Sequence, residues 1–349
     1  MISYPEENLP LAVKAMDSMP HTEVLWKYLP EILACDSSNE FSQTGNFPFK
    51  AAVFNIERGA YLKQIIAYFR YHALLRDVDV IFANEVDCGM ARTGNLDIPR
   101  EIAGALGMNF AYAVEFLSLE AGQKGNGPGF HGNAVFSRFP LSGIKAVRLP
   151  IKYEWFHCQD QRRLGTRCAV LAEIEPGPGL RIGLVSVHLE NRATPQDRKE
   201  QMEFLLDEAE ASFGKDMPVL IGGDLNTLCY EGSGGEGDSY LADHPGEQLR
   251  RLGQVPSWEP LLDYAASRGF GYGDCNILEK PTCRGPLKDG RTVLLNLDWF
   301  LCRGAACSRP VRVESIFRRK SLVNAPEEVY AYYGQELADH DMVLVTCGT

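Results

Sequence analysis

Acidic, amide and histidine side chains stand at or just after the ends of several short apolar runs in this sequence. In chain order they are Asn55, Glu57, Glu85, His188, Asp224, Asn226, Asp298, Asp339 and His340. Ligand sites in α/β proteins lie beyond the carboxyl ends of strands, so we expect these side chains to converge if the runs are strands. Carboxylates and amides suit a hard divalent cation, and histidines beside them can move protons. The pattern therefore indicates a site for metal-assisted hydrolysis.

Each of these residues also has a simpler explanation when it is taken alone. Asn55 could be a turn residue, Glu85 a solvated strand end, and His188 a satisfied core histidine. Asp224 and Asn226, in the sequence GGDLNT, could form an ordinary Asx turn. The joint pattern argues against these explanations, because buried strands seldom end in so many carboxylates that would be costly to bury unpaired.

The apolar runs have the length and composition of buried β-strands. They are rich in Val, Ile and Phe and are bounded by glycine, proline or charged residues. The predicted strands are 51–56, 78–85, 133–138, 168–174, 182–189, 218–225, 297–302 and 342–347. Periodicity and capping predict helices over 60–76, 195–213, 259–268 and 326–335, and a short one near 22–33. Strand-rich halves with interleaved helices favour two sheets packed on each other with helices outside.

The chain reads as one domain with an extension. No repeat and no linker interrupts residues 49–349, which we expect to form the catalytic domain, with residues 1–48 packed on it. Three long segments, 118–132, 152–166 and 229–247, are predicted to be loops, which in compact domains are commonly functional or mobile. The glycine-rich segment 229–247 is either part of the substrate rim or a solvated surface loop.

Composition and charge narrow the class of protein. The chain has 349 residues and a net charge of −11, which does not favour duplex DNA as a partner, although a local basic rim could compensate. The ten cysteines are scattered without a CxxC pair, so we expect reduced core thiols. We find no signal-peptide pattern and no apolar run long enough for a membrane span, and we predict a cytoplasmic protein. The oligomeric state is not predicted.

Seven short motifs occur in an order that resembles a known superfamily. FNIE, NE, GNAVFSR, SVHLEN, GGDLNT, LDWF and ADHD are similar to the motif series of the endonuclease/exonuclease/phosphatase superfamily, over residues 49–345. That group includes DNase I-like nucleases, inositol-polyphosphate phosphatases and neutral sphingomyelinases. The resemblance implies an α/β (α+β) four-layer sandwich, in which two packed mixed β-sheets are flanked by helices. It also implies a Mg²⁺ cofactor, with Mn²⁺ as the alternative.

The resemblance further implies a role for each matching residue. The metal would be held by Asn55, Glu57, Glu85 and Asp339. The catalytic group would consist of His188 at a phosphate oxygen, Asp224 and Asn226 at the attacking water and the phosphate, and His340 oriented by Asp298. Substrate contacts are expected from Asn133 and Arg167. Either Asp224 or His340 could be the general base.

The expected activity is hydrolysis of a phosphate ester by in-line attack of an activated water. A small-molecule or lipid-headgroup substrate, cut by a phosphodiesterase or phosphatase, suits the acidic charge. A nuclease is the alternative and would need a basic, aromatic rim. Candidates for such a rim are Arg162, Arg163 and Arg167 with Trp155 and Phe156, or Arg318, Arg319 and Lys320 beside Phe317. A third alternative is a binding protein that keeps the fold without the chemistry.

Overall fold

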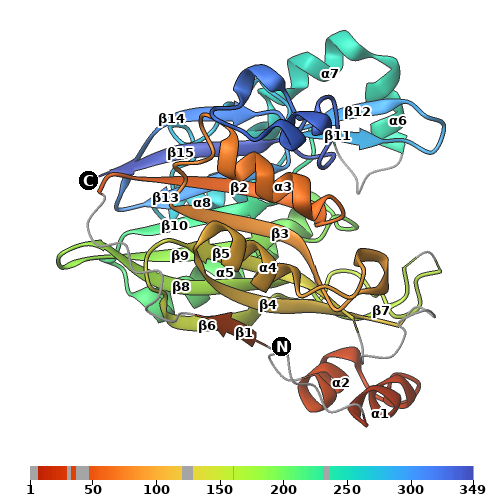
Figure 1. The fold of residues 1–349 in the computed structure, drawn as a ribbon. Helices are drawn as coiled ribbons and strands as arrows, with labels where there is room; N and C mark the ends of the chain where they lie inside the picture. The colour runs from red at the N-terminus through yellow and green to blue at the C-terminus, as the bar shows by residue number, and fades with distance from the viewer. Residues whose placement is uncertain are drawn as a thin grey trace.

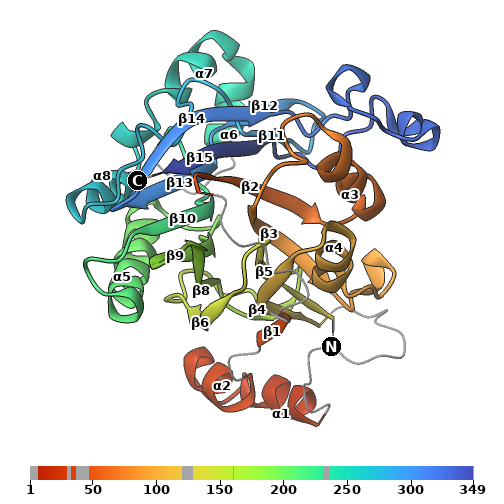
Figure 2. The same cartoon turned by 60° about the vertical axis from the view of Figure 1, so that its left-hand side comes forward.

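The computed structural model describes residues 7–29, 33–36, 47–119, 129–159, 161–230 and 236–348. Two β-sheets pack face to face, and helices cover their outer faces (Figures 1 and 2). The predicted four-layer α/β sandwich is therefore confirmed. No helix among the described residues is long and apolar enough to cross a membrane.

The larger sheet has eight strands. They are β1 (Leu33–Asp36), β2 (Phe49–Arg58), β3 (Val80–Cys88), β4 (Asn109–Ser118), β5 (Phe130–Ser137), β7 (Arg163–Gly165), β14 (Ala306–Val313) and β15 (Met342–Gly348). The order is β1-β4-β5-β3-β2-β15-β14, with β7 paired to β4. The sheet is mixed, because β2 and β3 are parallel while β15 runs antiparallel to β2. Strand β15 thus lies between β14 and β2 (Figure 1).

The smaller sheet has five strands. They are β6 (Ser142–Arg148), β8 (Cys168–Gly177), β9 (Leu180–His188), β10 (Val219–Asp224) and β13 (Asp298–Arg303). The order is β13-β10-β9-β8-β6, and only β9 and β10 run parallel among these pairs. A separate hairpin pairs β11 (Cys283–Pro286) with β12 (Thr292–Leu295).

Helices flank both sheets. The α-helices are α1 (Asn8–Ala15), α2 (His21–Tyr28), α3 (Leu62–Tyr71), α4 (Ile98–Leu106), α5 (Pro195–Phe213), α6 (Glu236–Asp243), α7 (Pro245–Leu252) and α8 (Pro260–Ser267). Short 3-10 turns are η2 (Ala91–Thr93), η3 (Val255–Ser257), η4 (Arg319–Ser321) and η5 (Glu327–Tyr332). Figure 2 shows α3 and α4 on the side of the larger sheet and α5 and α8 on the side of the smaller sheet.

Alternation along the strands builds the layers. Phe49, Ala51 and Val53 of β2 point into the core between the sheets, whereas Ala52 and Phe54 point outward to the helix layer. This period of two is the geometry of a strand that is buried on both faces. It explains why the strand sequences read as continuous apolar runs rather than as alternating ones.

A glycine in the GGD sequence allows the two sheets to approach closely. A Cβ atom on Gly222 would lie 2.8 Å from a Val53 methyl carbon and 2.9 Å from the Phe82 ring. Any side chain here would collide with the facing sheet, so glycine is required by packing. The same strand ends at Asp224 and delivers it to the sheet edge.

Several predicted elements differ from the structure. The helix predicted over 326–335 is only the 3-10 segment η5, since a segment bounded by Pro326 and Gly334 is too short for a stable α-helix. The helix near 22–33 ends at Tyr28, two residues before Pro30, which cannot continue it. The loop predicted over 229–247 contains α6 and the start of α7. Residues 231–235 of that loop, and residues 120–128 of the loop predicted over 118–132, lie outside the described residues.

The described part of the N-terminal extension is joined to the rest of the chain by an ion pair, a hydrogen bond and strand pairing. His21 of α2 lies 2.7 Å from Glu154, and Arg148 of β6 donates to the Leu25 carbonyl over 3.3 Å. Strand β1 pairs with β4 at the edge of the larger sheet. These contacts support the proposal that residues 1–48 pack on the catalytic domain.

Candidate active site

The register of the strands brings the predicted polar residues to one edge of the two sheets. In β10, Asp224 is paired with His188 of β9 on one side and with Asp298 of β13 on the other. In the larger sheet, Asn55 of β2 is paired with Asn84 of β3. His340 comes two residues before β15 and reaches the same group.

The Asp224 carboxylate is at the centre of this group. Asn55 donates from Nδ2 to its Oδ2 atom over 3.0 Å, so the two sheets are joined at the site. The Nε2 atoms of His188 and His340 lie 3.4 and 3.8 Å from the same oxygen. Its other oxygen accepts the backbone N–H of Asn226 over 2.9 Å. Burial, partly opposed by the nearby His340, raises the pKa of Asp224 to about 7.

His340 is held in an orientation that keeps it charged. Its Nδ1 atom lies 2.8 Å from Oδ2 of Asp298, and both side chains are buried. Burial works against a charged ring, but the Asp298 carboxylate outweighs it and raises the pKa of His340 well above its usual value. The imidazolium then presents Nε2–H toward Asp224, as expected for a carboxylate-oriented histidine.

The variant Asp298→Asn tests this pair. The limb of the pH profile of kcat/KM that reports His340 is expected to move to lower pH by at least about one pH unit, because a neutral amide no longer favours the charged ring. Because the pKa of His340 is higher in the folded than in the unfolded protein, the interaction of its charged ring with Asp298 stabilises the fold. This stabilisation is complete below the unfolded-state pKa of about 6.5 and is lost as pH rises through the folded-state pKa. The variant should therefore lose most stability in acid.

The matched control for this variant is Asp289→Asn, an exposed carboxylate in the turn between β11 and β12. It should leave both the pH profile and the unfolding curve unchanged. A profile of Asp298→Asn that superimposes on the wild-type profile would show that Asp298 does not set the charge of His340.

His188 is neutral by contrast. Nη1 of Arg167 donates to its Nδ1 atom over 2.9 Å, which leaves the ring proton on Nε2, facing Asp224. Burial, reinforced by the charge of Arg167, holds the pKa of His188 well below its usual value. This histidine can therefore donate one hydrogen bond at the site without carrying charge.

Three partly exposed carboxylates lie beside this buried group. The backbone N–H of Asp339 donates to Glu57 over 3.3 Å. Burial raises the pKa values of both Glu57 and Asp339. Repulsion from Asp339 and Glu85 adds to this for Glu57, and repulsion from Glu85 adds to it for Asp339. Glu85 itself stays ionised, because nearby histidines and arginines outweigh its burial and lower its pKa. A divalent cation would relieve this crowding of negative charge, so the residues fit a metal.

Two groups of three residues have possible metal-ligand atoms close to one another. Asp224, Asp298 and His340 have donor atoms within 4.8 Å of one another, as do Cys283, Asp339 and His340. In the first group, His340 already bonds Asp298 through Nδ1. Among the residues that the structure describes, no group of this spacing includes Glu57 or Glu85, which suits an ion that keeps water ligands between carboxylates.

Backbone strain marks the same edge. Glu57, Glu85 and Asn226 have positive φ angles of 45°, 55° and 50°, which non-glycine residues rarely adopt. Register shifts interrupt β2 after Asn55 and β3 after Ala83, so Glu57 and Glu85 both lie where the ladder is broken. Strain of this kind costs about 1–3 kcal/mol per residue and commonly occurs at functional sites.

Asn133, which the sequence predicts to contact the substrate, lies beneath the Asp224 group. It is fully buried and bonds Asn84, Glu115 and the Cys168 carbonyl. Asn84 in turn accepts the backbone N–H of Asp224 over 2.8 Å. Asn133 therefore supports Asp224 through Asn84, and its contact with a substrate stays a prediction. Arg167, also predicted to bind substrate, does line a cavity at the site.

Sequence reasoning missed the second layer of charged residues. Asp341 is fully buried and accepts hydrogen bonds from Arg284 and Arg312, which fixes the segment that carries His340. Glu115 lies 3.4 Å from Arg167, and burial raises its pKa to about 7. A single charged residue within an apolar strand sequence could have indicated such buried charges, as Glu115 does in FAYAVEFLS.

Comparison with known proteins decides the family. The sequence matches the Endonuclease/Exonuclease/phosphatase family over residues 52–319, well over half of the chain. The chain belongs to the endonuclease/exonuclease/phosphatase family. Members of this family are hydrolases that act on phosphate esters, and they generally use a divalent metal. No curated protein matches the sequence.

Solved structures of the endonuclease/exonuclease/phosphatase family share the fold at low sequence identity. A protein from Bacteroides vulgatus has a TM-score of 0.53 at 12% identity and covers 86% of this chain and 99% of its own. A protein from Beutenbergia cavernae has a TM-score of 0.51 at 16% identity, covering 86% and 71%. The human Nocturnin catalytic domain with bound sulfate has a TM-score of 0.50 at 15% identity, covering 91% and 97%.

Proposed function

We propose that this protein is a divalent-metal-dependent hydrolase that cleaves a phosphate ester of a small molecule or lipid headgroup by in-line attack of water. The observation that carries the proposal is the convergence of Asn55, His188 and His340 on the Asp224 carboxylate, beside three crowded carboxylates. Such a set combines a proton acceptor, hydrogen-bond donors and metal ligands in one place, which is what phosphate-ester hydrolysis requires.

The protonation states of the buried residues suggest a separate catalytic role for each of them. Asp224, with a pKa raised to about 7, accepts a proton from the attacking water. His340, kept charged by Asp298, stabilises the negative charge that develops on the phosphate oxygens. His188 donates one neutral hydrogen bond, and Asn226, whose amide is held by the Leu189 carbonyl, positions the phosphate.

Glu57, Glu85 and Asp339 would hold the metal, with Asn55 close by. When bound, the cation neutralises phosphate charge and stabilises the leaving oxygen. Asn55 donates to Asp224 and accepts the backbone N–H of Glu57 over 3.1 Å, so it links the metal side of the site to the side that handles protons.

The exposure of the aromatic residues supports a small substrate over a nucleic acid. Bases in single strands stack on exposed aromatic rings. In the first predicted rim, Trp155 and Phe156 are each only 2% exposed, and in the second rim Phe317 is fully buried. Neither rim offers a stacking surface from these residues.

We also propose a cytoplasmic location, which is supported by ten free cysteines, of which nine are buried.

Metal removal provides the test. We expect hydrolysis of bis-p-nitrophenyl phosphate or p-nitrophenyl phosphate to stop with EDTA and to return with Mg²⁺ or Mn²⁺. The variant Glu85→Ala should need at least about tenfold more metal for half-maximal rate, because it removes a charged ligand. Glu208→Ala, at a surface carboxylate that pairs with Lys145, is the control. Turnover that survives EDTA would refute the metal dependence, and no turnover of either ester with any metal would favour a binding protein.

A further inference from the structure

A cavity lined by arginines adjoins the candidate active site. It has a volume of about 130 Å³, and its lining includes Arg58, Arg92, Arg163, Arg167, Arg192 and His131. Glu85 also lines it, and Arg167 contacts His188, so the cavity opens beside the proposed metal and phosphate position. In a chain of net charge −11, such a concentration of guanidinium groups in one cavity needs an explanation.

Some of this positive charge is balanced within the protein. Arg167 lies 3.4 Å from Glu115 and 3.5 Å from Glu190, and Arg92 pairs with the buried Asp87 over 2.7 Å. Arg163 has no direct ion pair among the residues that the structure describes, although it lies in the same cavity. The cavity therefore holds more positive charge than its buried acids neutralise.

Aromatic rings fix the guanidinium of Arg163. Its Cζ atom lies 3.8 Å from the Phe116 ring centre and 3.7 Å from the Trp155 ring centre. Burial, reinforced by the neighbouring Arg167, lowers the pKa of Arg163 to about 9. The guanidinium is thus held in place with its charge poorly compensated, a situation that an anion in the cavity would relieve.

Arg192 is placed in a similar way at the same cavity. It lies 4.9 Å from the Trp155 ring centre and donates to the Tyr153 hydroxyl over 2.9 Å. The guanidinium groups of Arg163 and Arg192 are thus both held in place by the Trp155 ring. Each guanidinium carries N–H donors in one plane, in an arrangement that matches two oxygens of a phosphate. Trp155 itself is fixed by a hydrogen bond from its ring N–H to Glu190 over 2.9 Å.

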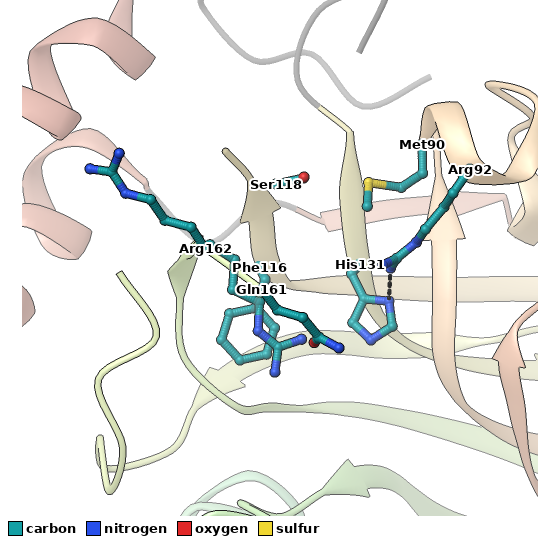
Figure 3. A pocket seen from close by; sticks show the side chains of 8 residues that line it. Met90, Arg92, Phe116, Ser118, His131, Gln161 and Arg162 are labelled. Carbon is teal, nitrogen blue, oxygen red and sulfur yellow. Dashed lines mark hydrogen bonds between the residues drawn. The ribbon is translucent and has the colours of Figure 1, made fainter. Parts of the chain in front are cut away.

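An adjoining pocket shares four of these lining residues, namely Arg92, His131, Gln161 and Arg163. Figure 3 shows His131 and Arg92 meeting there, joined by a contact of 3.3 Å, while Arg162 is directed away from them. The basic lining thus continues from the active-site edge along β5 and η2. Of the two neighbouring arginines in the predicted rim, Arg163 faces the cavity and Arg162 stacks on Phe156 instead.

We propose that this arginine cavity binds a second phosphate group of the substrate, one that is not hydrolysed, so that the preferred substrate is a small bisphosphate. This inference rests on the proposed function for the placement of the first phosphate. The cavity is of a size for one such group, and its indole, being only 2% exposed, is not available to stack a base. A small bisphosphate therefore fits better than a polynucleotide.

Matched competitors that differ only in the second phosphate test the proposal. Fructose bisphosphate and ribulose bisphosphate should inhibit hydrolysis of bis-p-nitrophenyl phosphate at concentrations at least about tenfold lower than their monophosphates do. In Arg163→Gln this ratio should fall to near one. Arg192→Gln serves if the first variant does not fold, and Arg319→Gln, at an exposed arginine of η4, is the control.

Calorimetric binding of fructose bisphosphate to the His340→Ala protein separates this inference from the proposed function. Binding that depends on Arg163, together with a wild-type protein that turns over no ester with any metal, would uphold the cavity and refute the hydrolase. Normal turnover with bisphosphates no tighter than monophosphates would overturn the inference alone. Competition by a single-stranded oligonucleotide that depends on Arg163, without competition by bisphosphates, would also overturn it.

Discussion

Replacing His340 by alanine is expected to lower kcat for bis-p-nitrophenyl phosphate by about 10²–10³-fold, the range for removing one positioned group that stabilises charge in the transition state. The ring lies 2.8 Å from Asp298 and 3.8 Å from Asp224, so its loss removes a positive charge from the centre of the site. Asp224 would then face Asp298 without an intervening cation, and its pKa would rise further. Steady-state kinetics at saturating metal measures the effect.

Two controls make the His340 result interpretable. His244→Ala removes an exposed histidine that stacks on Tyr240, and it should leave kcat unchanged. Thermal unfolding of His340→Ala shows whether the fold survives, because the residue is buried. A folded His340→Ala protein whose kcat is within about twofold of wild type would exclude His340 from stabilising the charge of the transition state.

Replacing Glu259 by alanine is expected to lower the free energy of unfolding by about 3–5 kcal/mol, because it leaves the charge of Arg198 buried without a partner. Both side chains are fully buried and pair with each other. Glu259 also accepts the backbone N–H of Leu228 over 2.7 Å, two residues after Asn226. Urea unfolding followed by circular dichroism measures the loss, and a lower kcat should accompany it.

The control for Glu259 is an ion pair on the surface. Glu208 pairs with Lys145 over 2.7 Å with both side chains partly exposed, and Glu208→Ala should cost less than about 1 kcal/mol. A Glu259→Ala protein that loses no more than this control would show that the Arg198 charge finds water or another partner, and that the loop after Asp224 is held by other contacts.

Local patterns were sufficient to predict the fold and the residues at the sheet edge. Strands buried on both faces read as apolar runs, and their polar ends are conspicuous against that background, as Asp224 is after PVLIGG. The start of α5 could also be predicted from sequence, because Thr194 and Asp197 form a capping box around Pro195. These signals lie within a few residues of each other in sequence.

Features that depend on distant contacts could not be predicted in the same way. Asn133 and Asn55 carry the same amide and are both buried, yet Asn55 bonds Asp224 directly whereas Asn133, on the antiparallel strand β5, bonds Asn84. The partners of Asp341, Arg284 and Arg312, come from two other strands, and nothing near Asp341 in sequence indicates them. Pairings of this kind depend on the register between strands.

The position of β15 between β14 and β2 has a consequence for the synthesis of the protein. Strand β2 is made early, but its edge finds its partner only when residues 342–348 have left the ribosome. Because His340 precedes β15, a nascent chain can carry Glu85 and Asp224 in place and still lack a complete site. Contacts this distant in sequence slow folding and leave a strand edge open to other chains. We therefore expect chaperones that shield unpaired strand edges to raise the yield of correctly folded protein during translation more than they do for full-length refolded chains.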